Sequence, residues 1–269
     1  ALRFQATDQT RLRAGIGRYS QFPLLRELIE PAGQPNLTPE WALQASAGVD
    51  HDFSAGFSGE LTVYHLWLRD LVIGREDRFE FVLGPPPTPP LDTDAYANDA
   101  TGLSTGAEGL LRYEDPRVAA WLGATLSRST RVKRPGADRG RFEYDQPLVL
   151  TAAGSYKLPR SISLGARLRL ASGNPYTPVA NRGFDLDEHT WYPIYDLDNS
   201  ARMPAFFALD LRIDKAWTFE RWQLTGYLDL QNATNRRNVE LINWSRDWSE
   251  ELRVYGLPII PAFGLKGAW

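Results

Sequence analysis

Apolar and polar side chains alternate along much of this chain with a period of two residues. The clearest stretch covers residues 206–215. Its apolar row is Phe207, Leu209, Leu211 and Ile213, and its opposite row is Ala208, Asp210, Arg212 and Asp214. Because successive side chains of a β-strand point to opposite faces, the pattern predicts a strand with one apolar and one charged face.

The same alternation recurs in about eleven segments, which predicts an all-β, antiparallel fold. The segments are residues 2–7, 10–18, 43–49, 57–73, 102–113, 118–126, 148–157, 161–170, 206–215, 222–230 and 257–269. No run approaches the ~20 apolar residues that a spanning helix needs. A helical membrane protein is therefore excluded. A barrel is not excluded, because only every second side chain of a barrel strand faces lipid.

Short turns and long connections follow one another in strict rotation. The turns are residues 7–10, 53–56, 114–117, 158–160 and 218–221, and the long connections are residues 19–40, 74–101, 131–146, 173–204 and 245–256. The turns use Asp, Gly, Ser and Pro, as tight turns require. Long structureless loops are uncommon in compact soluble domains but normal on the outer side of an outer-membrane barrel. We therefore expect a transmembrane β-barrel, with the Pro-rich piece 84–90 in an outer loop.

Composition agrees with this class and excludes others. Nine Trp, eleven Tyr and twelve Phe are typical of a protein with aromatic rings at membrane interfaces. The net charge of -3 gives no basic field for nucleic acid, and with no cysteine there is no disulfide framework. The three histidines show no HExxH spacing, and no Walker A or GxGxxG unit is present. We expect neither an enzyme nor a bound cofactor.

Eleven is an odd number of strands, and bacterial single-chain barrels have an even number. An open sheet edge is not tolerated in lipid, because every backbone group must be paired there. We therefore expect residues 1–269 to be one C-terminal portion of a larger barrel domain, cut within a strand at Ala1. The missing strands belong either to the same protein or to a separate chain.

Six stretches, in order along the chain, resemble the C-terminal half of the barrel of TonB-dependent outer-membrane receptors. They are Gly-Arg-Tyr-Ser-Gln-Phe-Pro at 17–23, Asn-Leu-Thr-Pro-Glu at 36–40, Gly-Leu-Ser-Thr-Gly-Ala-Glu at 102–108, Ser-Gly-Asn-Pro-Tyr-Thr-Pro at 172–178, Leu-Asp-Leu-Gln-Asn-Ala-Thr-Asn at 228–235 and Gly-Leu-Lys-Gly-Ala-Trp at 264–269. The resemblance implies a barrel of twenty-two strands with a plugged lumen. It implies a receptor in the outer membrane of a Gram-negative bacterium, with lipid, a plug domain and TonB as partners. The plug and the TonB box are not in this sequence.

The resemblance further implies capture of a scarce ligand by the outer loops and its uptake through the lumen, driven by TonB. Siderophores, cobalamin, glycans and peptides all remain open as the ligand. The alternative is a non-transporting barrel subunit that acts as a scaffold in an outer-membrane complex. A passive porin and a soluble β-sandwich are weaker alternatives.

Two groups of residues are candidates for ligand binding. In the loop 184–199, Trp191, Tyr192 and Tyr195 offer rings for stacking, and Asp185 and Asp187 offer carboxylates. Calcium binding by these two with Asp196 and Asp198 is a less favoured alternative. On the charged rows, Arg167, Arg169 and Arg212 are expected to face the lumen, where they either guide a polar ligand or form compensating ion pairs. For Trp244 and Trp248 we favour interfacial anchors over loop contacts.

Overall fold

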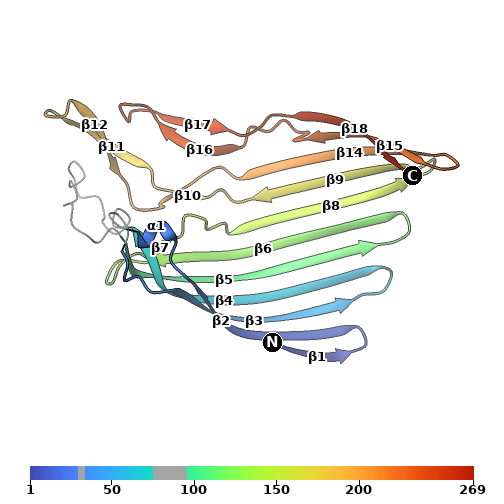
Figure 1. The fold of residues 1–269 in the computed structure, drawn as a ribbon, viewed down its shortest axis with the longest axis horizontal. Coiled ribbons are helices and arrows are strands. Elements are labelled where there is room, and N and C mark those ends of the chain that lie inside the picture. The colour runs from blue at the N-terminus through green and yellow to red at the C-terminus, as the bar shows by residue number, and fades with distance from the viewer. Residues whose placement is uncertain (30–33, 75–95) are drawn as a thin grey trace.

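The computed structural model describes residues 1–29, 34–74 and 96–269 and shows one large antiparallel sheet (Figure 1). Its eleven successive strands are β1 (Leu2–Thr7), β2 (Thr10–Gln21), β3 (Glu40–Asp52), β4 (Phe57–Gly74), β5 (Tyr96–Glu114), β6 (Val118–Val132), β8 (Leu148–Leu158), β9 (Ile162–Ala171), β14 (Phe206–Thr218), β15 (Gln223–Gln231) and β18 (Ile260–Ala268). The prediction of about eleven antiparallel strands is confirmed. Strands β1 and β18 form the two edges of this partial barrel.

The tight turns lie at one end of the sheet, on the right in Figure 1, and the long connections lie at the other. The register confirms the predicted turns, since Thr7 pairs with Thr10 and Asp52 with Ser58. Gly56 has a φ of 83°, a left-handed conformation that costs glycine least. We call the turn end the inner end and the opposite one the outer end.

The apolar pattern underestimates how far the strands extend. Strand β2 continues to Gln21 and β5 begins at Tyr96, inside the predicted connections 19–40 and 74–101. Pairing of the backbone continues past the last apolar position, so a pattern of side chains cannot locate the strand end. The Pro-rich piece 84–90 lies outside the described residues.

The long outer connections carry structure of their own, so the prediction that they are structureless is wrong. The small elements are α1 (Leu25–Leu28), β7 (Gly140–Arg141), which pairs with β6, and three two-stranded sheets. Two of these sheets are hairpins, β11 (Val179–Asp185) with β12 (Thr190–Tyr195) and β16 (Val239–Trp244) with β17 (Glu251–Tyr255), and the third pairs β10 (Pro175–Tyr176) with β13 (Ala201–Arg202). Pairing within each connection satisfies backbone groups that a bare loop would leave to water. No helix in the described part of the chain is long and apolar enough to cross a bilayer.

The register places the predicted rows on two opposite faces of the sheet. On the apolar face Leu209 pairs with Leu168, and on the polar face Asp210 pairs with Arg167. Of the apolar residues described, only Ala100 and Ala208 are buried, whereas Phe263 is 88% exposed. A sheet that turns its large apolar side chains outward requires an apolar surrounding, which a bilayer provides.

Candidate ligand-binding surface at the outer end

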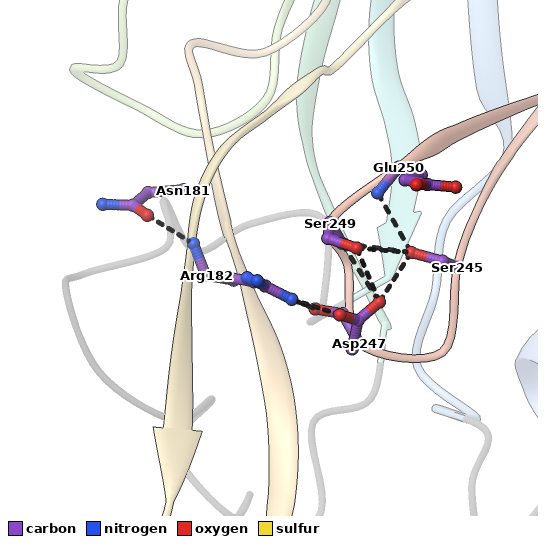
Figure 2. A network of polar contacts seen from close by, with 6 residues as sticks. All are labelled: Asn181, Arg182, Ser245, Asp247, Ser249 and Glu250. Carbon is purple, nitrogen blue, oxygen red and sulfur yellow. Dashed lines mark hydrogen bonds and ion pairs between the residues drawn. The ribbon is translucent and has the colours of Figure 1, made fainter.

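Two of the outer hairpins are joined by a network of polar contacts (Figure 2). Arg182 on β11 donates to the Asp247 carboxylate and, over 2.8 Å, to the Asp247 carbonyl oxygen in the turn between β16 and β17. The Ser245 and Ser249 hydroxyls donate to the same carboxylate, each over 2.8 Å. These contacts join segments that lie 65 residues apart in the sequence.

The turn that carries Asp247 is itself fixed by side-chain contacts. The Ser245 hydroxyl accepts the backbone N–H groups of Ser249 and Glu250, over 3.1 and 3.0 Å. The hydroxyls of Ser245 and Ser249, followed by the Arg182 guanidinium, hold the pKa of Asp247 far below its ordinary value. The carboxylate is therefore charged, and positioned for Arg182, at any physiological pH.

Arg182 also orders the aromatic residues of the first hairpin. Its guanidinium lies 4.4 Å from the centre of the Trp191 ring, and the Phe184 ring meets the same indole edge-on at 5.0 Å. Trp191 remains 38% exposed, so part of this supported ring faces solvent. A ring that is already held loses little entropy when a ligand stacks on it.

The second contact between the hairpins is aromatic. Tyr195 and Trp248 meet edge-on with their centroids 6.3 Å apart. Trp248 has a φ of 58°, which the Ser245 turn imposes on it. Trp248 therefore makes a loop contact and is not the interfacial anchor that we favoured from the sequence. Trp244 lies in β16 opposite Glu251. Burial raises the pKa of Tyr195, whose ring is covered in this contact.

Tyr192 lies on the other face of the β11–β12 hairpin. It pairs with Gly183, and a Cβ on that glycine would lie 2.2 Å from the Tyr192 ring. The glycine thus lets the tyrosine lie flat across the neighbouring strand. Of the three predicted aromatic residues, Trp191 and Tyr195 contribute to the surface between the hairpins, whereas Tyr192 does not.

The predicted acidic residues serve the hairpin turn. Asp185 accepts the backbone N–H groups of Asp187 and Glu188, over 2.8 and 3.1 Å, and so closes the turn between β11 and β12. Asp196 accepts the N–H of Leu197, and Asp198 pairs with Lys133 at 2.6 Å. Across the described residues, no three His, Cys, Asp or Glu side chains converge in a way that would hold a metal ion.

A further ion pair anchors the outer connections to one another. Arg202 on β13 donates to the Asp145 carboxylate over 2.8 Å and to the Gly173 carbonyl over 2.8 Å. Asp145 is almost fully buried. The connections after β6 and β9 are therefore fastened together at the mouth of the sheet.

Arg167, Arg169 and Arg212 lie apart from the hairpins, on the polar face of β9 and β14. Arg167 donates twice to Asp210, over 2.9 and 2.7 Å. Arg212 pairs with Asp214 at 2.8 Å and with Asp229 at 3.5 Å. Arg169 lies 5.3 Å from the Phe206 ring centre. Compensating pairs thus occupy Arg167 and Arg212, and a ligand role for the three arginines stays a prediction.

The polar face also contains a hollow of about 440 Å³ across β2, β4, β5, β6 and β8. Arg13 and Arg112 pair with Glu60 along one side of it, at 3.6 and 2.5 Å. Glu108 lines the same hollow, and it forms no hydrogen bond or ion pair with any described residue. A carboxylate in this position suits a basic group that enters from the lumen side.

Arg182 and Asp247 were not foreseen from the sequence. Each is a single charged residue in a long connection, and no spacing rule relates two positions 65 residues apart. The one available signal is local, since Ser245 and Ser249 flank Asp247 in a pattern typical of side-chain-closed turns. That signal predicts a turn and gives no partner for it.

Residues 1–233 match the protein family described as TonB dependent receptor-like, beta-barrel. The fold resembles that of P. aeruginosa FpvA bound to heterologous pyoverdines, with a TM-score of 0.66 and 14% identity over 98% of this chain and 31% of FpvA. It also resembles the FrpB iron transporter of Neisseria meningitidis, with a TM-score of 0.64 and 14% identity over 98% of this chain and 38% of FrpB. The Yersinia pestis ferric yersiniabactin uptake receptor FyuA gives a TM-score of 0.59 and 14% identity over 98% of this chain and 35% of FyuA.

The chain spans about a third of the length of these solved structures. Comparison with curated protein sequences gave no match. The similar structures are receptors and transporters rather than enzymes.

Proposed function

We propose that this chain, which belongs to the TonB-dependent receptor-like β-barrel family, is part of a receptor in the outer membrane of a Gram-negative bacterium. The receptor takes up a scarce ligand through that membrane. Residues 1–269 then form the C-terminal portion of one barrel domain. The remaining strands close the barrel between the edges β1 and β18, which lipid would not tolerate unpaired. Siderophore, cobalamin, glycan and peptide all remain candidate ligands.

The observation that carries the proposal is the pair of joined hairpins above a sheet with one apolar and one charged face. The apolar face suits lipid and the charged face suits a wet lumen. Above them, the Arg182–Asp247 contact holds the exposed ring of Trp191 in place before a ligand arrives. Ligand capture at this surface, with Trp191 and Tyr195 as contacts, is the function that this arrangement supports best.

Uptake through the lumen requires a domain that closes the lumen at rest and moves to let the ligand pass. The proposal assigns this role to a plug domain, which TonB displaces at the expense of the proton-motive force. The unpaired Glu108 in the lumen-side hollow supports a plug that carries a basic side chain. By contrast, Arg167 and Arg212 are already paired and contribute to the charged wall.

The test is energised uptake by cells that express the native full-length protein. Candidate ferric siderophores, cobalamin, glycans and peptides are screened for binding, and uptake of a bound ligand is followed with and without TonB. We expect uptake to stop without TonB while surface binding persists. Equal accumulation in cells that lack TonB would contradict the proposed mechanism.

Substitution of the aromatic surface tests where the ligand binds. Trp191→Ala is expected to weaken binding roughly tenfold, because a stacked aromatic anchor is worth more than about 1 kcal/mol. Trp222→Ala is the matched control, since Trp222 stacks on Phe219 at the inner end of the sheet. Unchanged affinity in Trp191→Ala, with an identified ligand, would move the binding site away from the hairpins.

A further inference from the structure

The β16–β17 hairpin presents different side chains on its two faces. It extends from the outer end of β15 and β18, along the upper margin of Figure 1. Because side chains alternate along a strand, the strand register divides its cross-strand pairs between the faces. One face carries Leu241–Val254 and Asn243–Leu252, and the other carries Ile242–Arg253 and Trp244–Glu251. We call the first the uncharged face, since none of its four residues is Asp, Glu, Lys or Arg.

The opposite face and the turn of this hairpin lie against the preceding outer connection. Glu251 accepts a hydrogen bond from the Tyr176 hydroxyl over 3.2 Å. The turn reaches the same connection through the ion pair of Arg182 with Asp247 and the contact of Tyr195 with Trp248. Residues 173–204 therefore contact one face and the turn, and leave the uncharged face to another partner.

The uncharged face is apolar and open. Leu241, Leu252 and Val254 are 48%, 46% and 44% exposed. Leu241 lies directly opposite Val254, and Leu252 lies diagonally across from Leu241, so the three side chains form one patch. The patch lies beyond the outer end of β15, in a connection rather than in the sheet that a bilayer would surround. A contiguous apolar patch of this kind is typical of a surface that another segment covers.

Contacts between consecutive outer connections indicate which segment this is. Residues 131–146 are joined to residues 173–204 by the pair of Asp145 with Arg202, and residues 173–204 are joined to the β16–β17 hairpin by Arg182. This series stops at the uncharged face, beside the edge strand β18. Since β18 runs from the outer to the inner end, an antiparallel partner runs outward and leads into the next outer connection.

We propose that the uncharged face docks the outer connection that follows the strand paired with β18, in the part of the protein that completes the barrel. That connection presents apolar side chains, because a charge buried against Leu241, Leu252 and Val254 would have no partner. The contact joins the first and last strands of the barrel at their outer end. It also holds the hairpin that fixes Arg182 from a second side. The inference rests on the proposed function, which supplies the remaining strands.

Photo-cross-linking in the native full-length protein tests the proposal. Val254→benzoylphenylalanine places a photoreactive side chain on the uncharged face, and mass spectrometry of the irradiated, digested protein identifies what it joins. We expect a cross-link to the outer connection after the strand paired with β18, within the same polypeptide. Arg253→benzoylphenylalanine is the matched control, since this adjacent position lies on the opposite face, and we expect it to join residues 173–204 instead.

Amide exchange gives a second measurement on the same protein. Leu252→Asp places a charge on the uncharged face and should accelerate exchange in the docked connection several-fold, because the charge opposes burial of the patch. Leu186→Asp is the matched control. Leu186 is 79% exposed in the turn between β11 and β12, so the same change there should leave exchange in the docked connection unaltered.

A cross-link from position 254 to lipid, to a second copy, to another protein or to residues 173–204 would overturn the proposal. The absence of any cross-link would do the same, and Leu252→benzoylphenylalanine repeats the test if the first variant does not reach the membrane. Neither measurement involves a ligand or TonB. A protein that gives the expected cross-link but takes up no ligand therefore refutes the proposed function and leaves this inference standing, and the reverse also holds.

Discussion

The eleven-strand sheet and the outer hairpins are both made of paired strands, yet different contacts hold each of them. In the sheet, the face on which a side chain lies is set by whether its position along the strand is odd or even. Leu211 therefore faces outward and Arg212 inward whatever their neighbours are. In the hairpins, the position of β11–β12 against β16–β17 depends on individual side chains, above all Arg182 and Asp247. The sheet should therefore tolerate the loss of any one polar contact, whereas the loss of one of these few contacts should loosen the two hairpins.

The largest expected effect is a charge on the apolar face of the sheet. Leu211 lies midway along β14 and pairs with Ala166 and Leu230. Leu211→Arg should cost about 2–4 kcal/mol of folding free energy, because arginine near the bilayer midplane is desolvated. Equilibrium unfolding in urea, from lipid vesicles, measures the change.

The control for that substitution is Ser163→Arg, on the polar face of β9 opposite Asp214. It places the same side chain in the wet lumen, beside a carboxylate, and should change the folding free energy by less than about 1 kcal/mol. If the two substitutions cost the same, the assignment of the faces to lipid and lumen is wrong.

A smaller, local effect is expected from removing the contact between the hairpins. Arg182→Met keeps the aliphatic stem but loses both the bonds to Asp247 and the cation over Trp191. Because the pair is partly exposed, we expect amide exchange in residues 179–195 and 239–255 to accelerate by up to about fivefold, with the unfolding midpoint of the sheet unchanged.

Arg253→Met is the matched control for this comparison. Arg253 bonds to Glu251 over 2.8 Å within its own hairpin, so its loss breaks no contact between the two. Faster exchange confined to residues 239–255 is expected there. If Arg182→Met left residues 239–255 unaffected, the hairpins would be independent of one another.

The sequence predicts the sheet well and the binding surface poorly, for a physical reason. Alternation with period two shows on which face of the sheet a side chain lies. It assigns Leu209 and Asp210 to opposite faces without any knowledge of the residues they pair with. The contact between Arg182 and Asp247 depends on how two long connections bend, which no local pattern encodes. Asp185 shows the same limit of local patterns. The acidic and aromatic residues of its loop suggested a ligand contact, but its carboxylate accepts the backbone N–H of Asp187 and so closes the turn.

The smallest expected effect comes from acid. Since the pKa of Asp247 is held below its ordinary value, its charge contributes fully above the unfolded value of about 3.9 and is lost as pH falls through the lowered folded value. Exchange in residues 239–255, corrected for its intrinsic pH dependence, should therefore stay constant from pH 7 to about 5 and rise only below about pH 4.

Other carboxylates of the hairpins titrate in the same acid range, so the wild-type profile alone does not identify the group. Ser245→Ala does, because the Ser245 hydroxyl is the largest cause of the lowered pKa of Asp247. Its removal should move the loosening of residues 239–255 to higher pH, while residues 179–195 follow because Arg182 loses the same charged partner. An identical pH profile in Ser245→Ala would mean that the charge of Asp247 does not hold the hairpins together. The conclusion that single side chains fix the position of the hairpins, whereas the alternation of side chains fixes the sheet, would then be wrong for Asp247.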